Sequence, residues 1–146
     1  MPTPYGAIYE RALFRLSDTK LAQLQPEEQE YILNKHLMAA VADFEPKCAE
    51  NLADRDDETK SFTGELSNEV QEILALGMSY YWLSAQVLNS ELLKNKLSTK
   101  DYTYFSPANL LRESGELRNS VQKEYRRRIT DYTFDHGDLA MEGSAL

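Results

Sequence analysis

Apolar residues recur along most of the chain at intervals of three and four positions, the spacing that predicts amphipathic helices. The first such segment covers residues 5–16 and has its apolar side chains at Tyr5, Ile8, Ala12 and Leu16. The strict alternation of apolar and polar residues that is typical of strands is scarce. We therefore expect an all-α fold with little or no sheet.

A second helix is predicted from Pro26 to about Phe44. Proline suits the first helical position, and the three glutamates that follow favour the positive end of the helix dipole. The buried face of this helix is expected to include Tyr31 or Ile32, and then Leu37, Met38, Val41 and Phe44. Pro46 marks the end of the helix or a kink. Residues 48–63 are polar and charged, which predicts a surface loop with about one helical turn.

The segment after residue 67 predicts the most buried helix of the chain, and Asn68, or Ser67 before it, can cap its start. One apolar stripe contains Val70, Ile73, Leu74, Gly77, Met78, Tyr81, Ala85 and Leu88, and a second face contains Leu76, Tyr80, Leu83 and Val87. A helix that is apolar nearly all round lies in the middle of a bundle or at a subunit interface. Residues 73–90 carry no charge, but polar residues interrupt them and a membrane span needs about 20 apolar residues. A buried helix is therefore expected, with Met78 near its most buried point.

Ser106 and Pro107 predict the clearest helix start in the chain, a capping residue followed by proline at the first helical position. This helix is expected to end near Ile129, with an apolar seam at Leu110, Leu117, Val121, Tyr125 and Ile129. Residues 131–146 have no helical period and predict an extended tail. The predicted fold is therefore a small bundle of about four main helices in residues 1–130, followed by an extended C-terminal tail in residues 131–146.

Composition agrees with a single helical domain and narrows the function. The 146 residues are 42% hydrophobic and 27% charged, enough for one modest core. The net charge of −8 argues against a dedicated DNA-binding domain, which usually needs a basic face. An acidic surface can still line a passage through which DNA slides, although acidity also serves solubility alone. The N-terminus lacks a basic region followed by an apolar run, so no signal peptide is expected.

Residues suited to catalysis are few. The chain has no Gly-rich phosphate loop and no CxxC, HExxH or GxSxG motif. Two histidines, His36 and His136, leave little material for a nucleophilic triad or a multi-histidine metal site. Cys48 is the only cysteine, which favours a reducing compartment and a packing role for its side chain. We therefore expect a protein that is not an enzyme and holds no cofactor.

One acidic segment partly matches a calcium-binding loop. Asp54, Asp56, Glu58 and Glu65 stand at the offsets of the first, third, fifth and twelfth positions of such a loop. The sixth position needs glycine for a sharp turn and is Thr59 here. The sequence therefore favours a solvated acidic loop over a metal site.

Aromatic and basic residues supply the candidate interaction sites. The candidates are Tyr102, Tyr104, Phe105, Arg126, Arg127, Tyr132 and Phe134. Tyrosine and tryptophan are enriched where proteins meet, although packing on the chain's own core is an equally open interpretation for the loop at 102–105. The arginines can contact phosphates or favour the negative end of the helix dipole, and the two tail aromatics can become ordered on a neighbour.

Six stretches form a recognisable set: residues 54–58 (DRDDE), 72–78 (EILALGM), 80–83 (YYWL), 87–93 (VLNSELL), 100–111 (KDYTYFSPANLL) and 123–126 (KEYR). Together they resemble the neck, or head-to-tail connector, proteins of tailed bacteriophages, over about residues 4–137. The resemblance implies a helical subunit that forms a ring, typically of about twelve copies, beneath the portal. Such a ring extends the DNA channel and docks the next neck or tail protein.

The resemblance also implies where the protein acts and with what. Its partners would be further copies of itself, the portal protein and the next neck or tail-completion protein. DNA would pass through the channel without sequence-specific binding, and no membrane would be involved. The protein would be made in the cytoplasm of the bacterial host and reside in the virion neck. The family has no catalytic residues to carry over.

Two other classes of protein remain open from the sequence. The first is a cytosolic helical binding module, such as a small regulator or inhibitor of a host protein, which would be monomeric or dimeric and have no affinity for a portal. The second is an enzyme, for which the chain offers few acid–base groups or nucleophiles. The size of the purified protein distinguishes a ring from a small binding module.

Overall fold

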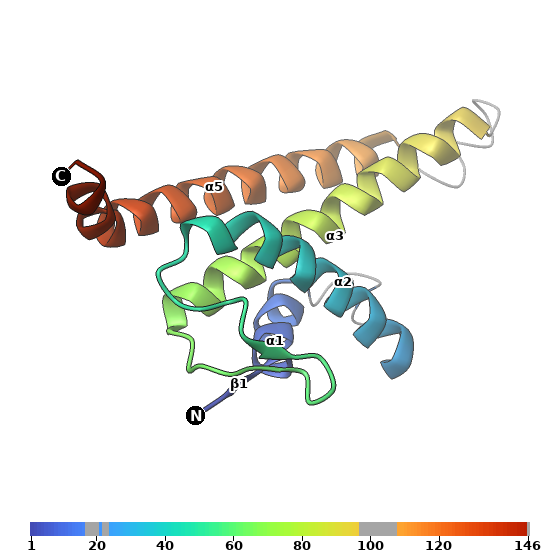
Figure 1. The fold of residues 1–146 in the computed structure, drawn as a ribbon. Helices are drawn as coiled ribbons and strands as arrows, with labels where there is room; N and C mark the ends of the chain where they lie inside the picture. Colours follow the sequence, from blue (N-terminus) through green and yellow to red (C-terminus); the bar gives the residue numbers. More distant parts are fainter. Residues whose placement is uncertain (17–20, 22–23, 97–107, 146) are drawn as a thin grey trace.

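A computed structural model describes residues 1–16, 21, 24–96 and 108–145, with side chains for 1–16, 21, 24–89 and 115–136 (Figure 1). Four α-helices dominate it: α1 (Tyr5–Arg15), α2 (Pro26–Phe44), α3 (Asn68–Lys96) and α5 (Ala108–Ala145). A short 3-10 helix, Glu45–Lys47, follows α2. The prediction of an all-α bundle of about four main helices is therefore confirmed.

Two of the helix starts follow from the residues that precede or open them. Helix α2 begins at Pro26, with Glu27 and Glu28 in its first turn, as predicted. At the start of α3, the Ser67 hydroxyl accepts a hydrogen bond from the backbone N–H of Val70 at 3.3 Å. Ser67 is therefore the residue that caps this helix.

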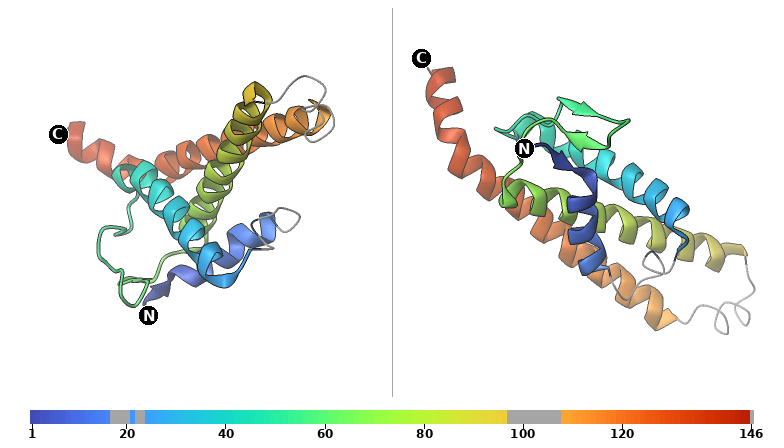
Figure 2. Two further views of the ribbon diagram at one scale, coloured as in Figure 1. Left: turned by 90° about the vertical axis from the view of Figure 1, so that its right-hand side faces the viewer. Right: turned by 90° about the horizontal axis from the view of Figure 1, so that it is seen from below.

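Helix α3 is the central element of the bundle. It packs against α1, α2 and α5, and it forms a long antiparallel hairpin with α5 (Figures 1 and 2). Its side chains at Val70, Ile73, Leu74, Ala75, Leu76 and Met78 are almost completely buried. The prediction that this helix is most buried around Met78 is confirmed. Of its three consecutive aromatic residues, Trp82 is 7% exposed and lies in the core, whereas Tyr80 and Tyr81 are half-buried.

A small antiparallel sheet lies beside α1, where the sequence predicted a loop with a helical turn. Its strands are β1 (Thr3–Pro4), β2 (Arg55–Asp56) and β3 (Ser61–Phe62), in the order β1-β3-β2. The Phe62 ring packs against Tyr5 with ring centroids 5.1 Å apart. The Asp56 carboxylate accepts the backbone N–H of Glu58 at 2.8 Å, which closes the hairpin turn. Burial of Phe62 and this local turn chemistry therefore favour a hairpin over a helical turn.

The C-terminal part of the chain differs from the prediction of an extended tail. Helix α5 runs without interruption from Ala108 to Ala145, so it crosses the expected boundary at residue 130. Tyr132, placed in the tail by the sequence, is fully buried in the core. Leu117, expected on the apolar seam, is instead 51% exposed.

No described helix is both long enough and apolar enough to cross a membrane.

Candidate interaction surfaces

The structure places the predicted interface residues in three different environments. Tyr102, Tyr104 and Phe105 lie outside the described residues. The side chains of Arg126 and Arg127 are exposed on α5, and Phe134 is 74% exposed further along the same helix. Tyr132 is the exception, because it is a core residue, and its selection as an interface candidate is corrected here.

Tyr132 joins the C-terminal half of α5 to the C-terminal end of α2. Its ring meets that of Phe44 edge-on, with centroids 5.0 Å apart, and its other side stacks on His136 at 4.0 Å. Its hydroxyl accepts the backbone N–H of Ala49 at 3.0 Å and lies 3.8 Å from the Cys48 Sγ. Burial raises the pKa of Tyr132 to about 12, so the hydroxyl is neutral at physiological pH. Tyr132 is therefore a packing residue, and Cys48 fills space beside it.

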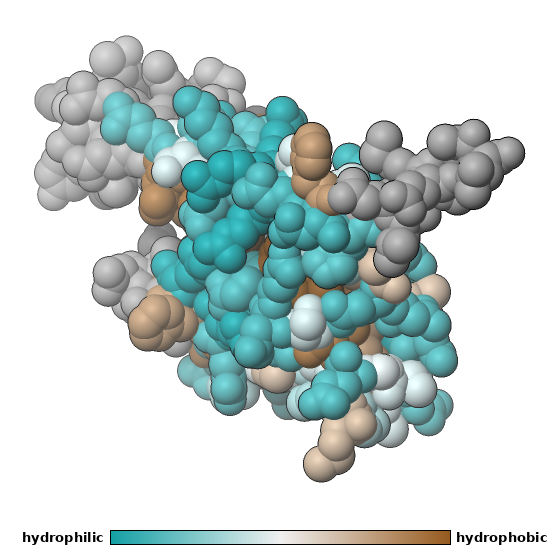
Figure 3. All heavy atoms as spheres, turned by 90° about the vertical axis from the view of Figure 1, so that its left-hand side faces the viewer, coloured by the Kyte–Doolittle hydropathy of each residue, from teal (hydrophilic) through white to brown (hydrophobic). Residues whose placement is uncertain are grey.

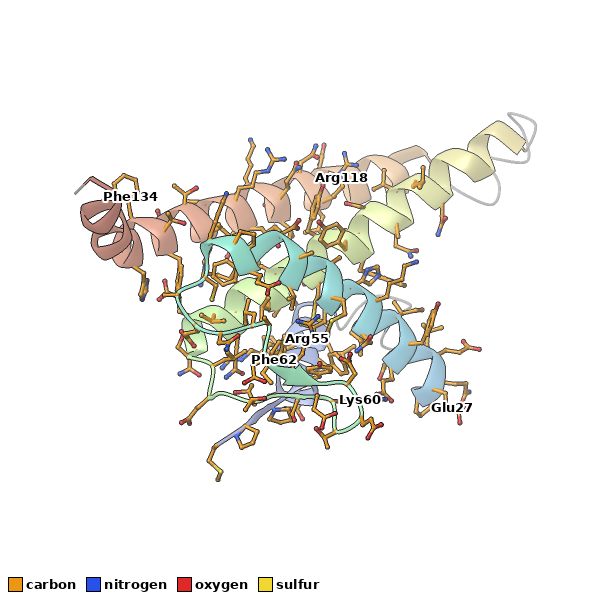
Figure 4. All side chains as sticks on the ribbon, viewed as in Figure 1. Glu27, Arg55, Lys60, Phe62, Arg118 and Phe134 are labelled. Carbon is orange, nitrogen blue, oxygen red and sulfur yellow. The ribbon has the colours of Figure 1, made fainter. Side chains whose placement is uncertain are left out.

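The outer face of α5, defined here by Lys123, Arg126, Arg127 and Phe134, points away from the bundle. All four side chains are exposed, and Figure 4 shows side chains of this helix projecting from its free side. Lys123 and Arg127 line a shallow hollow of about 310 Å³ on the helix. Within this stretch Arg128 is paired with Glu124 at 3.4 Å. The outer face therefore carries more cations than carboxylates, together with an aromatic ring, and the exposed carboxylates of Asp131 and Asp135 lie beside it. The chain as a whole has a net charge of −8.

A second surface, which we name the α2–hairpin groove, lies between α2 and the β2–β3 turn. Its lining combines charged, polar and apolar side chains: Glu27, Glu30, Tyr31, Asn34, Met38, Asp57 and Lys60 enclose about 380 Å³. Tyr31 is 73% exposed there. Lys60 is paired with Glu30, and the Asp57 carboxylate accepts the Tyr5 hydroxyl at 2.8 Å. Three carboxylates against one ammonium leave this groove negatively charged.

A third surface is the α1–α3 groove, which encloses about 660 Å³ beside Phe14. Phe14 is 84% exposed. Arg11 and Arg15 line the groove, but both pair with the Glu72 carboxylate, at 2.7 and 2.8 Å. Burial alone would raise the pKa of Glu72, yet the hydrogen bonds from Arg15 and Arg11 outweigh it and lower that pKa. The ion pairs of these guanidinium groups with Glu72 therefore link α1 to α3.

A cluster of tyrosines around Asp43 joins three helices, and no pattern in the sequence indicated it. The Asp43 carboxylate on α2 accepts the hydroxyls of Tyr81 on α3 and Tyr125 on α5, the latter at 3.1 Å. The Tyr80 ring stacks on Tyr125 with centroids 6.2 Å apart. Gln122 donates a hydrogen bond to the Tyr80 hydroxyl at 3.3 Å. The cluster therefore fixes α2, α3 and α5 relative to one another.

The cluster predicts loss of stability in alkali. Burial, followed by the interactions with Asp43, raises the pKa of Tyr81 and of Tyr125 above the usual value. A tyrosine in an unfolded chain ionises at about pH 10, so the folded state holds these protons more tightly. The resulting stability is complete below about pH 10 and is lost as the pH rises through the folded-state pKa values. We expect Tm to fall in this alkaline range.

This prediction is checked by thermal unfolding across the alkaline range, followed by circular dichroism together with the ultraviolet absorbance of tyrosinate. The control replaces both Tyr81 and Tyr125 with Phe, which removes the two titrating groups and keeps the rings. That variant should show a shallower fall in Tm. An equal fall in both proteins would assign the alkaline transition to other groups.

The acidic segment and the cysteine complete the survey of possible chemical sites. The Asp54 carboxylate accepts the Thr63 hydroxyl at 3.1 Å, within the hairpin. Among the residues that the structure describes, no group of three or more His, Cys, Asp and Glu side chains is placed to hold a metal ion. Burial raises the pKa of the Cys48 thiol, which disfavours the nucleophilic thiolate.

The described chain is thus a helical bundle that offers exposed aromatic side chains on several separate faces. On the face seen in Figure 3, hydrophilic residues cover most of the surface and apolar ones form small separate areas. No family model matches the sequence, and neither a curated protein nor a solved structure matches it.

Proposed function

We propose that this protein is a structural subunit of the head-to-tail connector of a tailed bacteriophage. In this proposal the subunits form a ring beneath the portal, typically of about twelve copies. The ring extends the DNA channel and docks the next neck or tail protein. The protein is made in the bacterial cytoplasm and resides in the virion neck.

The observation that carries the proposal is the placement of exposed aromatic side chains on separate faces of one unit. Phe14, Tyr31 and Phe134 are each more than 70% exposed, and they stand on α1, α2 and α5. A closed ring needs two different contact faces on every subunit, because one face must bind the other face of the next copy. A third face then remains for the portal or for the protein below.

The long α3–α5 hairpin supports the same proposal. The end of this hairpin extends beyond α1 and α2 (Figure 1). The two helices also expose apolar side chains, Leu88 on α3 at 56% and Leu117 on α5 at 51%. Contiguous exposed apolar surface marks docking sites, and Leu88 and Leu117 are two apolar side chains that this hairpin offers for such a surface. The net charge of −8 suits a channel wall along which DNA slides without sequence-specific binding, because like charges repel.

A single observation favours the alternative of a cytosolic helical binding module. The α1–α3 groove is the largest of the hollows described above, and Phe14 stands at its edge. One host protein could dock there without any ring. This alternative predicts a monomer or dimer that has no affinity for a portal.

The test of the proposed function uses virions of the phage or prophage that encodes the chain. We expect antibodies against the protein to label the head–tail junction, and we expect a deletion of the gene to yield filled heads and free tails. The purified protein should be a monomer or small oligomer that forms a closed ring on isolated portal protein. Intact virions from the deletion strain would contradict the proposal, and co-purification with one host protein would favour the alternative.

A further inference from the structure

We propose that the outer face of α5 in one copy packs in parallel along the α2–hairpin groove of the next copy. Lys123 would then lie beside Glu27, Arg127 beside Tyr31, and Phe134 beside Met38. The occupant of the groove is a second copy of this chain. The inference rests on the proposed ring, and it specifies which two faces make the contact between neighbouring subunits.

The two helices present their groups at matching intervals. On α5 the outward positions Lys123, Arg127, Thr130 and Phe134 are spaced by four, three and four residues. On α2 the groove positions Glu27, Tyr31, Asn34 and Met38 are spaced by the same intervals. Intervals of three and four residues keep side chains on one face of a helix. Each set therefore forms one straight row of about 16 Å, given a rise of 1.5 Å per residue.

Aligned in parallel, the two rows bring compatible chemistry together at each step. Lys123 meets the carboxylate of Glu27, and the Arg127 guanidinium meets the face of the Tyr31 ring, a favourable cation–π arrangement. Thr130 and Asn34 can exchange a hydrogen bond.

At the end of the row, Phe134 meets the thioether of Met38, and contacts between sulfur and an aromatic ring are favourable. The reversed alignment would place Phe134 against Glu27 and Lys123 against Met38. The chemistry of the side chains therefore selects the parallel register.

Charge supports the identity of the occupant. On the outer face of α5 the exposed cations Lys123, Arg126 and Arg127 outnumber the one exposed carboxylate among them, Asp131. The groove, in contrast, carries three carboxylates against one ammonium. A chain with a net charge of −8 repels its own copies over most of its surface. Contact between this basic face and this acidic groove is the arrangement that turns the repulsion into attraction.

The placement of the two faces agrees with contacts between unlike surfaces. Figure 4 shows Phe134 and Glu27 at opposite ends of the molecule, so one copy uses both faces on two different neighbours. Helices α2 and α5 run in the same general direction in every view (Figures 1 and 2). A neighbour related by a small rotation, as in a ring of many copies, therefore presents its α5 parallel to this α2.

The test is disulfide trapping between two single-cysteine variants of the full chain, each carrying Cys48→Ser to remove the native thiol. One variant carries Phe134→Cys and the other Met38→Cys. Mixed at low salt under mild oxidation, they should give a heterodimer in yield about tenfold above that of a control mixture. The control pairs Phe134→Cys with Phe14→Cys, which replaces another exposed aromatic residue on α1.

Charge reversal provides the second arm of the test. Lys123→Glu in the Phe134→Cys chain should lower the heterodimer yield roughly tenfold, and Glu27→Lys in the partner chain should restore it. Lys47→Glu, which reverses an exposed cation that belongs to neither of the two faces as defined above, should leave the yield unchanged. A yield no higher than that of the Phe14→Cys control would overturn the proposal.

Other outcomes decide the register, the occupant and the link to the proposed function. Preferred trapping of Phe134→Cys with Glu27→Cys would overturn the parallel register. Binding of duplex DNA that is lost in Lys123→Glu, with trapping unaffected by the same change, would reassign the outer face to nucleic acid. If the protein were incorporated into virions but this contact were not trapped, the inference would be contradicted and the proposed function would be supported. If the contact were trapped but the protein were absent from virions, the inference would be supported and the proposed function would be contradicted.

Discussion

Replacing Tyr132 with Ala is expected to lower the free energy of unfolding by about 3–5 kcal/mol. The ring is fully buried between Phe44 and His136, and its hydroxyl accepts the Ala49 N–H. Truncation therefore leaves a cavity at the junction of α2 and α5, and it also leaves a backbone donor without its partner. Denaturant unfolding followed by circular dichroism measures the loss.

The matched control is Phe134→Ala, two residues further along the same helix. Phe134 is 74% exposed, so its truncation should change the stability by less than about 0.5 kcal/mol. Tyr132→Phe keeps the ring and should cost about 1 kcal/mol for the hydrogen bond. Equal losses in the two alanine variants would show that the end of α5 does not pack as described.

Truncation of the chain tests the same packing from another direction. A chain ending at residue 130 lacks Tyr132 and should lose at least as much stability as Tyr132→Ala. A chain ending at residue 136 keeps Tyr132 and its stacking partner His136, so its free energy of unfolding should be close to that of the full chain. If the shorter chain were as stable as the longer one, an independent tail after residue 130 would be the better description.

The sequence predicted the parts of the fold that depend on local signals. Pro26 begins a helix because its fixed φ suits the first turn, and Ser67 caps α3 with its hydroxyl. The two apolar stripes of α3 predicted a central helix because such a helix must be covered on more than one side. These features depend on a few neighbouring residues, so a single sequence contains them.

The parts that were missed depend on contacts between distant residues. Tyr132 looked like part of a tail because the residues after it lack a helical period, whereas its burial depends on Phe44, far away in the sequence. Asp43 looked like one more surface carboxylate, and only the fold brings Tyr81 and Tyr125 to it.

The candidate interaction surfaces also include features that the sequence predicted and features that depend on the fold. Arg126, Arg127 and Phe134 are exposed as predicted. The α2–hairpin groove was not predicted, because it forms only when the β2–β3 turn folds back beside α2. Tyr31 showed no sign of this role in the sequence, where it counted as a possible core residue of its helix.

Helix α3 lies very close to its neighbours at Gly77, which leads to the second large prediction. A Cβ atom added there would lie 2.7 Å from the Ala40 Cβ and 2.8 Å from the Cζ and Oη of Tyr125. The Ala40 methyl is fixed to the backbone of α2, and the Tyr125 hydroxyl is bonded to Asp43. Neither neighbour can move cheaply, so α2 and α5 would both have to shift away from α3.

Gly77→Ala is therefore expected to destabilise the protein by about 1–3 kcal/mol through overpacking, even though alanine favours a helix over glycine by about 1 kcal/mol. Gly115→Ala is the matched control, because an added Cβ there meets no described atom within 4 Å. That change should stabilise α5 by roughly 0.5–1 kcal/mol. Ala40→Gly placed on Gly77→Ala removes one of the two obstacles, and it should restore part of the loss if the pair is coupled through contact. A lower Tm for Gly77→Ala together with a higher Tm for Gly115→Ala would confirm the close approach. A higher Tm for both variants would show that α3 has room for a methyl group at residue 77.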